Sequence, residues 1–266
     1  MLRALHRVGL RDKQPFLWRM HNGLRVAIRA EEGLVASETV GWGCFLHRRW
    51  EPHVERALRE HLRPGHRAID VGANLGYFTA VMADAVGPSG RVWSFEPTPP
   101  IADDLEVSIA ANGHSQVEVF RTALGDHAGT VSISFDPRLA GNSSLIGPGS
   151  ESSTAYPVPM ARLDDLYDQG RVGLPRLIKV DVEGAELGVL QGATALITAA
   201  RPVVVFEVNA DMSQAAGWTL RQIADIFASC GPYRLRRLTE TGAVDVDPQT
   251  FDPTPGSYSD FVALPA

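Results

Sequence analysis

The sequence predicts a doubly wound α/β fold, in which helices cover both faces of a mainly parallel β-sheet. From residue 67 onward, short apolar runs alternate with helical stretches. The runs 177–182 and 202–208 are almost continuously apolar, as expected of strands that are covered on both faces. A glycine-containing turn follows the run 67–71, where a fold of this kind passes from its first strand into a helix.

The composition agrees with a folded globular protein. Of the 266 residues, 44% are hydrophobic and 21% are charged, which excludes a disordered chain, a collagen and a disulfide-stapled miniprotein. The two cysteines are too few for a zinc cluster or a disulfide framework. The longest apolar run is 203–206, far short of the roughly 20 residues that span a bilayer, and no secretory segment follows the start. We therefore expect a protein of the cytoplasm without a transmembrane segment.

Charge is distributed unevenly along the chain. Residues 1–69 contain 13 basic and 7 acidic residues, whereas residues 70–266 contain 12 basic and 24 acidic residues. The acidic main body argues against nucleic acid as a partner. The basic front segment leaves open an anionic surface or substrate, and the simpler interpretation is a solvated flank.

Before residue 67 we expect a hairpin and a helix. Asn22-Gly23 lies between two β-prone runs and is typical of a type I′ turn, which needs positive φ at both central residues. Apolar side chains recur with helical spacing over 51–63, and Pro64-Gly65 ends that pattern. The hairpin and the helix are candidate elements of a lid or of a homodimer interface.

After residue 67 the elements follow in regular order. We expect one helix at 77–86 and another at 187–197. Two more are expected to begin at a cap on Thr98, with Pro99 in the first turn, and at a capping box over 219–222. The segments 137–159 and 247–257 are rich in Gly, Pro, Ser and Asp and are expected to be loops, the first of them a binding lid. The expected strands are 67–71, 91–95, 117–120, 130–135, 177–182, 202–208, 233–238 and 261–264.

The turn after the first strand indicates a ligand site. It reads D-x-G-x-N-x-G, with Asp70, Gly72, Asn74 and Gly76, and therefore differs from the G-x-G-x-x-G of dinucleotide-binding folds. Glycines allow the backbone to approach a ligand closely. The carboxylate of Asp70 would repel a phosphate and could hold a cationic amine. The alternative is a purely structural glycine turn.

The second strand ends in Phe95-Glu96-Pro97, 20 positions after Gly76. A carboxylate at this place can accept hydrogen bonds from both hydroxyls of a ribose. A ligand that carries an amine, a carboxylate and a ribose, but no phosphate, fits both sites. S-adenosylmethionine is such a ligand. A solvent-facing Glu96 is the alternative.

Charged residues cluster at the ends of the fourth and fifth strands. Lys179, Asp181, Glu183 and Glu186 belong to the segment IKVDVEGAEL, and Glu207 and Asn209 follow PVVVF. A charge within an apolar strand is costly unless it is paired, so we expect Lys179 to pair with a carboxylate. Such pairing could also be purely structural.

The motifs together resemble the FkbM family of S-adenosylmethionine-dependent methyltransferases over residues 50–264. The resemblance implies a three-layer, Rossmann-like class I methyltransferase fold with seven strands, the last antiparallel. It divides the chain into an extension, 1–50, and a methyltransferase domain, 51–266. The segments that carry it are DVGANLGYFT, FEPTPP, NSSL at 142–145, MARLDDL at 160–166, IKVDVEGAELGVLQGA at 178–193 and FEVN at 206–209.

The resemblance also implies positions for the cofactor. Ala123 and Leu124 would flank the adenine, with Asp126 as a weaker candidate, and Asn142 and Ser143 would lie near the cofactor or the acceptor. The remaining cofactor-binding candidates are Asp70, Gly72, Asn74, Gly76, Tyr77, Phe78, Glu96 and Pro97.

Members of this family are mostly O-methyltransferases, which implies a hydroxyl acceptor on a sugar, a glycolipid or polysaccharide, or a natural product. A base would assist the transfer. Asp181, near the transferring methyl, is the first candidate, followed by Glu183 and Glu207, with Lys179 beside them. Alternatively, Asp181, Glu207 and Asn209 could offer oxygens to Mg²⁺, although no Asp-Asp pair follows the fifth strand.

Two other functions are compatible with the motifs. One is an NAD(P)-dependent oxidoreductase, which the form of the glycine turn disfavours. The other is a cofactor-binding scaffold without catalysis. None of the eight histidines has ligand spacing with another. His47, His53 and His66 could face the site, although we expect them at the surface or as satisfied interior residues.

Overall fold

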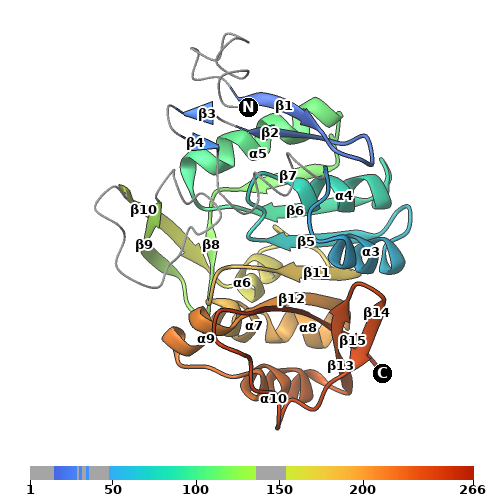
Figure 1. Ribbon diagram of the computed structural model, residues 1–266, viewed down its shortest axis with the longest axis vertical. Helices are drawn as coiled ribbons and strands as arrows, with labels where there is room; N and C mark the ends of the chain where they lie inside the picture. Colours follow the sequence, from blue (N-terminus) through green and yellow to red (C-terminus); the bar gives the residue numbers. More distant parts are fainter. Residues whose placement is uncertain (1–14, 29, 32–33, 36–47, 136–153) are drawn as a thin grey trace.

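The centre of the molecule is an eight-stranded sheet. The computed structural model describes residues 15–28, 30–31, 34–35, 48–135 and 154–266. The strands lie in the order β14-β13-β15-β12-β11-β5-β6-β7 (Figure 1). Their bounds are β5 Arg67–Val71, β6 Arg91–Phe95, β7 Val117–Phe120, β11 Leu177–Val180, β12 Val203–Asn209, β13 Tyr233–Thr239, β14 Gly242–Asp245 and β15 Tyr258–Pro265.

The sheet confirms the expected class I arrangement. Strands β7, β6, β5, β11 and β12 pair in parallel. The last strand, β15, is antiparallel both to β12 and to β13, between which it lies. These seven strands correspond to the prediction, and β14 adds an eighth at the edge because it forms a hairpin with β13.

Helices cover both faces of the sheet, as predicted. Side chains of a strand alternate between its faces, and in β12 Val203 and Val205 join one apolar cluster while Val204 and Phe206 join the other. The first cluster includes α3 (Pro52–His61) and α4 (Tyr77–Val86), with Ile101 of α5 (Pro99–Asn112). The second is covered by α6 (Leu163–Asp168), α7 (Glu186–Gln191), α8 (Thr194–Ala200) and α10 (Leu220–Cys230). A further helix, α9 (Ala210–Ala216), follows β12 directly.

The single helix expected over 187–197 is two helices, α7 and α8. Asp164 of α6 accepts hydrogen bonds from the backbone N–H groups of Ala195 and Leu196, at 3.1 and 2.9 Å, and thereby satisfies a new helix start. The break also lets Gly192 pack against the carbonyl of Gly125, which a Cβ atom would approach to 2.0 Å. A contact with a distant helix, rather than local periodicity, therefore sets this boundary.

The expected loop 137–159 is wrong over its last part. Residues 154–159 belong to β10 (Thr154–Ala161), which pairs antiparallel with β9 (Gly129–Phe135). It pairs with β8 (Ala123–Leu124) only at Met160 and Ala161. Pro157 and Pro159 are tolerated because, among the described strands, β10 pairs with β9 alone along that stretch. Residues 137–153 lie outside the described residues, and 247–257 form a loop as expected.

The N-terminal hairpin consists of β1 (Phe16–Arg19) and β2 (Arg25–Ile28), and it lies against α5 (Figure 1). Its turn is not the expected type I′ turn, because only Gly23, with φ 88°, has a positive φ. Met20 accepts from Gly23 N–H at 3.0 Å and donates to Leu24 O at 2.7 Å, which describes a three-residue loop ending in a left-handed glycine. A short pair, β3 (Ala30–Glu31) and β4 (Leu34–Val35), follows.

No helix among the described residues is long and apolar enough to cross a membrane.

Candidate active site

A cavity of about 700 Å³ opens at the carboxyl ends of β5, β6, β11 and β12. This is the edge of a doubly wound sheet where ligands bind. Twelve of the residues that the sequence predicted for cofactor binding or catalysis line it: Gly72, Asn74, Tyr77, Phe78, Glu96, Pro97, Ala123, Leu124, Lys179, Asp181, Glu183 and Glu207.

The cavity has two chemically different sides. We call one the glycine-turn side; it consists of residues 72–75, Tyr77, Phe78, Glu96, Pro97, Ala123 and Leu124. We call the other the acidic side; it consists of Glu51, His53, Glu207, Tyr258 and Asp260. Lys179, Asp181 and Glu183, at the exit of β11, lie in the wall together with both.

The glycine turn packs closely against other parts of the protein. Gly72, Asn74 and Gly76 all have positive φ, of 79°, 48° and 88°. A Cβ atom on Gly72 would stand 1.7 Å from the carbonyl oxygen of Asp181, and one on Gly76 would stand 2.5 Å from a methyl group of Leu105. Gly72 is therefore required for the turn to pass beside the exit of β11, a reason that the motif alone did not reveal.

Glu96 is fixed at both carboxylate oxygens. Its Oε2 accepts from the backbone N–H of Asn74 at 3.0 Å and its Oε1 accepts from that of Thr98 at 2.9 Å. The residue is 5% exposed, and burial raises the pKa of its carboxyl against the opposing effect of these bonds. Each oxygen keeps a lone pair for a further donor. Thr98 stands at the N-cap of α5, but its side chain makes no capping bond there, contrary to the expectation.

Asp70 does not reach the cavity. It is fully buried and accepts a 2.6 Å hydrogen bond from the hydroxyl of Thr79, on α4. Burial raises the pKa of its carboxyl, and the charge of Lys179 opposes this. Direct contact with a ligand amine, the role that the sequence suggested, does not fit this position. Asp70 instead links the end of β5 to α4 through Thr79.

Lys179 pairs with a carboxylate, as expected. Its Nζ donates to Asp181 Oδ2 at 2.9 Å and lies 4.9 Å from the centre of the Phe78 ring. The residue is only 3% exposed. Burial alone would lower the pKa of this ammonium, but the charges of Asp181 and Asp70 raise it above its ordinary value. Lys179 therefore stays positively charged, and Asp181 balances its charge.

Three further carboxyl groups of the cavity, those of Glu51, Glu183 and Glu207, have raised pKa values. Burial, followed by the charges of Asp181 and Asp260, raises the pKa of Glu207 to about 11. Burial and the charge of Asp260 raise that of Glu51 to about 9. Burial and the charge of Asp181 raise that of Glu183 to about 8. At neutral pH these three side chains are therefore mainly neutral and can donate hydrogen bonds.

The acidic side contains residues that sequence reasoning missed. Glu51 and His53 come from the start of α3, and Tyr258 and Asp260 come from β15, which places Asp260 opposite Glu207 of β12. His53 Nε2 lies 2.6 Å from Asp260 Oδ2. His53 is thus a cavity residue, which was the less favoured of the two positions that the sequence left open for it.

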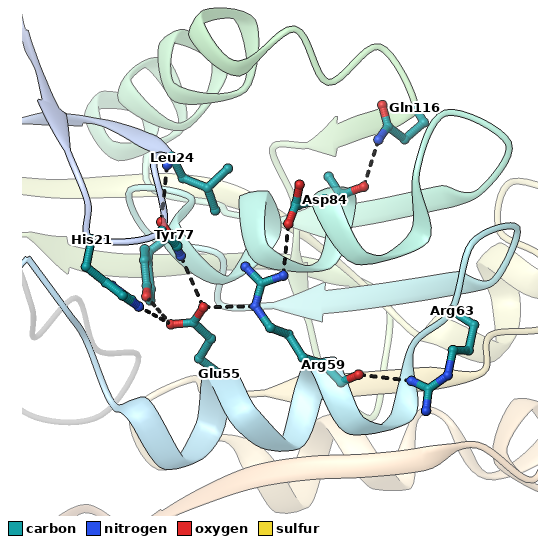
Figure 2. Close-up of polar contacts among 10 residues, drawn as sticks. His21, Leu24, Glu55, Arg59, Arg63, Tyr77, Asp84 and Gln116 are labelled. Carbon is teal, nitrogen blue, oxygen red and sulfur yellow. Dashed lines mark hydrogen bonds and ion pairs between the residues drawn. The ribbon is translucent and has the colours of Figure 1, made fainter.

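The start of α3 is held in place by Glu55 (Figure 2). This buried carboxylate accepts hydrogen bonds from Tyr77 of α4 at 2.6 Å, from Arg59 at 2.9 Å and from Asn22 of the hairpin turn at 3.1 Å. Burial would raise its pKa, but these bonds lower it below the ordinary value. Glu55 therefore ties the hairpin, α3 and α4 together one helical turn from Glu51.

Several other predicted residues lie away from the cavity. Asp126 is exposed, does not line the cavity, and accepts from His127 at 2.6 Å, so it has no place in the site. Glu186 is buried behind the site, where it accepts from the N–H groups of Val182 and Gly184. His66 is not in the cavity wall. Asn142, Ser143 and His47 lie outside the described residues.

The donors considered for Mg²⁺ do not converge. Asn209 uses its side-chain oxygen to cap α9, accepting from Asp211 and Met212. Asp181 is bonded to Lys179. Within residues 15–28, 48–135 and 154–266, no group of three or more His, Cys, Asp or Glu side chains is arranged to hold a metal ion.

Comparison with known proteins places this chain among methyltransferases. The methyltransferase sdnD of Sordaria araneosa is 34% identical over 153 residues, which cover 47% of this chain and 59% of the relative. The hexuronic acid methyltransferase AglP of Haloferax volcanii is 32% identical over 163 residues, which cover 61% of this chain and 64% of the relative. The chain thus spans less than two thirds of the length of either relative.

A methyltransferase FkbM from Methylobacillus flagellatus KT, a solved structure, has a TM-score of 0.49 at 17% identity, covering 84% of this chain and 60% of that one. The family model described as the methyltransferase FkbM domain matches residues 70–234, more than half of the chain. This chain belongs to the FkbM family of S-adenosylmethionine-dependent methyltransferases.

Proposed function

We propose that this protein is an S-adenosylmethionine-dependent O-methyltransferase whose acceptor is a neutral, hydroxyl-rich molecule such as a sugar, a glycolipid or polysaccharide, or a natural product. One observation carries the proposal. The cavity joins a buried, backbone-anchored Glu96 beside the glycine turn to a wall of neutral and paired carboxyl groups.

The glycine-turn side has the donor set that the cofactor needs. Glu96 would accept the ribose hydroxyls, because each of its oxygens has one bond to the backbone and lone pairs to spare. Ala123 and Leu124 offer apolar walls for the adenine. Bound S-adenosylmethionine supplies a methyl group on a positively charged sulfur. Asp181, at the exit of β11, presents negative charge to that region of the cavity.

The main contribution of the chain is to position the acceptor and exclude water, which can supply about 7–11 kcal/mol of the barrier reduction in such a reaction. Lys179 is buried and its ammonium is held by the partly exposed carboxylate of Asp181, so the two side chains fix each other beside the turn. We infer that this pair orients the reacting groups. Protonating Asp181 would leave the ammonium of Lys179 buried without its counter-charge, so Asp181 is a poor proton acceptor.

The acidic side supports a neutral acceptor. Glu51, Glu183 and Glu207 are mainly protonated at neutral pH, and therefore donate and accept hydrogen bonds as sugar hydroxyls do. An anionic acceptor would meet the charges of Asp181 and Asp260, and Lys179 is already paired with Asp181, which leaves Arg237 as the other cation of the described cavity wall. By its name, the relative from Haloferax volcanii acts on a hexuronic acid. For this chain we favour uncharged hydroxyl compounds.

Calorimetry and a transfer assay test this proposal. The purified protein should bind S-adenosylmethionine and S-adenosylhomocysteine but not NAD⁺ or NADP⁺. With labelled methyl donor, a panel of neutral saccharides and polyols should become labelled, whereas the matching uronic acids should not. Binding of a nicotinamide cofactor alone would favour an oxidoreductase. Binding of S-adenosylmethionine without transfer to any acceptor would favour a scaffold, and preferential labelling of uronic acids would contradict the neutral acceptor.

A further inference from the structure

We propose that His53, held by Asp260, is the general base that takes the proton from the acceptor hydroxyl. The proposal rests on the function inferred above. It assigns the reaction's proton to a pair of residues that come from the first helix of the domain and the last strand of the sheet. Both residues lie outside the segment matched by the family, 70–234.

The geometry of the pair sets the protonation of the ring. Nε2 of His53 is 2.6 Å from Oδ2 of Asp260, and a carboxylate in this position accepts a hydrogen from that nitrogen. The neutral ring then carries its proton on Nε2, so Nδ1 holds the free lone pair. Nδ1 has no hydrogen-bond partner in the part of the chain that the structure describes. An imidazole oriented in this way by a carboxylate is suited to accept a proton.

The place of the pair fits the same role. His53 and Asp260 both line the cavity, and their side chains are 21% and 12% exposed. Asp260 pairs with Glu207 across neighbouring strands, and Glu51 begins the helix that carries His53. The charge of Asp260 is among the causes that keep protons on Glu207 and Glu51. These two carboxyl groups can therefore hold an acceptor beside a residue that takes its proton.

The carboxyl groups predicted as bases are less suitable. Glu207 has a pKa of about 11 and Glu183 one of about 8, so at neutral pH each already carries the proton that a base must accept. Asp181 is committed to Lys179. His53 also lines the described cavity wall, and the carboxylate of Asp260 orients its ring. We therefore favour His53 over these carboxyl groups as the base.

The step balances without a further reactant. As the acceptor oxygen attacks, its O–H bond breaks and the proton passes to Nδ1 of His53. The oxygen lone pair forms the new O–CH₃ bond. The S–CH₃ bond breaks with its electron pair staying on sulfur, which becomes the neutral thioether of S-adenosylhomocysteine. The imidazolium then loses its proton to water as the products leave.

Other titratable or charged groups face the cavity beside His53, among them Glu183 with a pKa of about 8, so the His53 variant is needed to separate its contribution from theirs. Those that face the same part of the cavity from α3, β12, β13 and β15 are Glu51, Glu207, Arg237, Glu240, Tyr258 and Asp260. The pKa of Glu51 is about 9 and that of Glu207 about 11, and burial raises that of Tyr258. If methyl transfer by the wild type falls on acidification from neutral pH, and the His53 variant no longer shows this fall, the fall is assigned to His53.

The variants His53→Gln and Asp260→Asn test the proposal, with His61→Gln as the matched control. His61 lies on the same helix but not in the cavity wall. We expect His53→Gln to lower kcat by about 10²–10⁴-fold and to abolish the acidic limb of the pH profile. Its Kd for S-adenosylmethionine should stay within about threefold of the wild type. Asp260→Asn, a change at a positioning residue, should lower kcat by a smaller factor. His61→Gln should match the wild type.

A second readout does not depend on activity. In the full-length protein, nitrogen-15 NMR of the imidazole should show His53 in the Nε2–H form, and Asp260→Asn should remove this preference. A ring protonated at Nδ1 would overturn the proposal, as would a His53→Gln variant that keeps both kcat and the acidic limb. If the wild type bound no S-adenosylmethionine, the proposed function would fail by itself, and the NMR result would still decide whether the pair exists.

Discussion

The two sides of the cavity are built on different principles. On the glycine-turn side, backbone N–H groups fix Glu96 and a glycine fits where no side chain could. On the acidic side, side chains from α3, β12 and β15 face one another, and burial keeps several of their carboxyl groups protonated. The family match includes the first side completely but leaves out Glu51, His53, Tyr258 and Asp260. The matched segment thus contains the whole glycine-turn side, whereas part of the acidic side, which we propose binds the acceptor, lies outside it.

The largest expected effect comes from the turn that defines the glycine-turn side. Gly72→Ala adds a methyl group 1.7 Å from a backbone carbonyl, which cannot move aside as a flexible side chain could. We expect a loss of more than about 4 kcal/mol in the free energy of unfolding, in the range reserved for severe clashes. Urea denaturation, followed by circular dichroism, measures this.

Gly113→Ala is the matched control, because Gly113 also has a positive φ, of 71°, but faces open space. Only the left-handed backbone should matter there, at about 1–2 kcal/mol. Equal losses in the two variants would show that the turn does not press against the exit of β11, and the distinction between a backbone-built and a side-chain-built half would fail.

The next effect tests whether Glu96 reads the cofactor. In Glu96→Gln an amide nitrogen replaces one oxygen, so one backbone N–H and one ribose hydroxyl lose a charged acceptor. The Kd for S-adenosylmethionine should rise by about 10- to 100-fold, about 1.4–2.8 kcal/mol, as is usual for hydrogen bonds to charged groups. Calorimetry provides the measurement. Glu60→Gln, on the exposed face of α3, should bind as the wild type does. An unchanged Kd for Glu96→Gln would remove Glu96 from the cofactor site.

On the acidic side, the burial of Glu207 should lower the free energy of unfolding at neutral pH. Its pKa is about 11 in the folded protein against an ordinary 4.5, so between these values the folded state binds a proton that the unfolded state lacks. Folding stability therefore falls as pH rises through this window. Glu207→Gln removes that dependence and should stabilise the protein by about 1–3 kcal/mol at pH 7, with the gain disappearing near pH 4.5.

Thermal and urea unfolding of Glu207→Gln between pH 4.5 and pH 8 measure this gain. Glu60→Gln serves again as the comparison, because no buried carboxyl is altered. A gain that is the same at all pH values, or a loss at pH 7, would mean that Glu207 is ionised in the folded protein. The acidic side would then carry charge at neutral pH and would suit a cationic acceptor better than a neutral one.

The sequence predicted the features that depend on local patterns. Apolar runs located the strands, and the spacing between the glycine turn and Glu96 placed both at one edge of the sheet. The pairing of Lys179 with Asp181 followed from the cost of an unpaired charge. Each of these inferences needed only residues that are close in the chain or strands whose order a doubly wound fold fixes.

What escaped prediction depends on contacts between distant segments. The break between α7 and α8 requires Asp164, which lies about 30 residues earlier in the chain. His53 meets Asp260 across 207 positions, and only because β15 inserts between β12 and β13. The raised pKa of Glu207 arises from its burial and from the charges of acidic residues on neighbouring elements. Its residue type alone suggested a base, whereas a carboxyl group with this pKa is a hydrogen-bond donor at neutral pH. Periodicity and motif spacing contain none of this.

The smallest expected effect concerns metal. Asn209 is committed to the start of α9 and Asp181 to Lys179, and Glu207 would have to give up a proton that it holds to a pKa of about 11 before it could bind a cation. Methyl transfer should therefore be unchanged, within about 20%, after dialysis against EDTA and on addition of Mg²⁺. Transfer that stops with EDTA and returns with Mg²⁺ would require these groups to rearrange around an ion. The carboxyl groups of the acidic side would then be ionised and would bind a cation, and the contrast between the two sides would disappear.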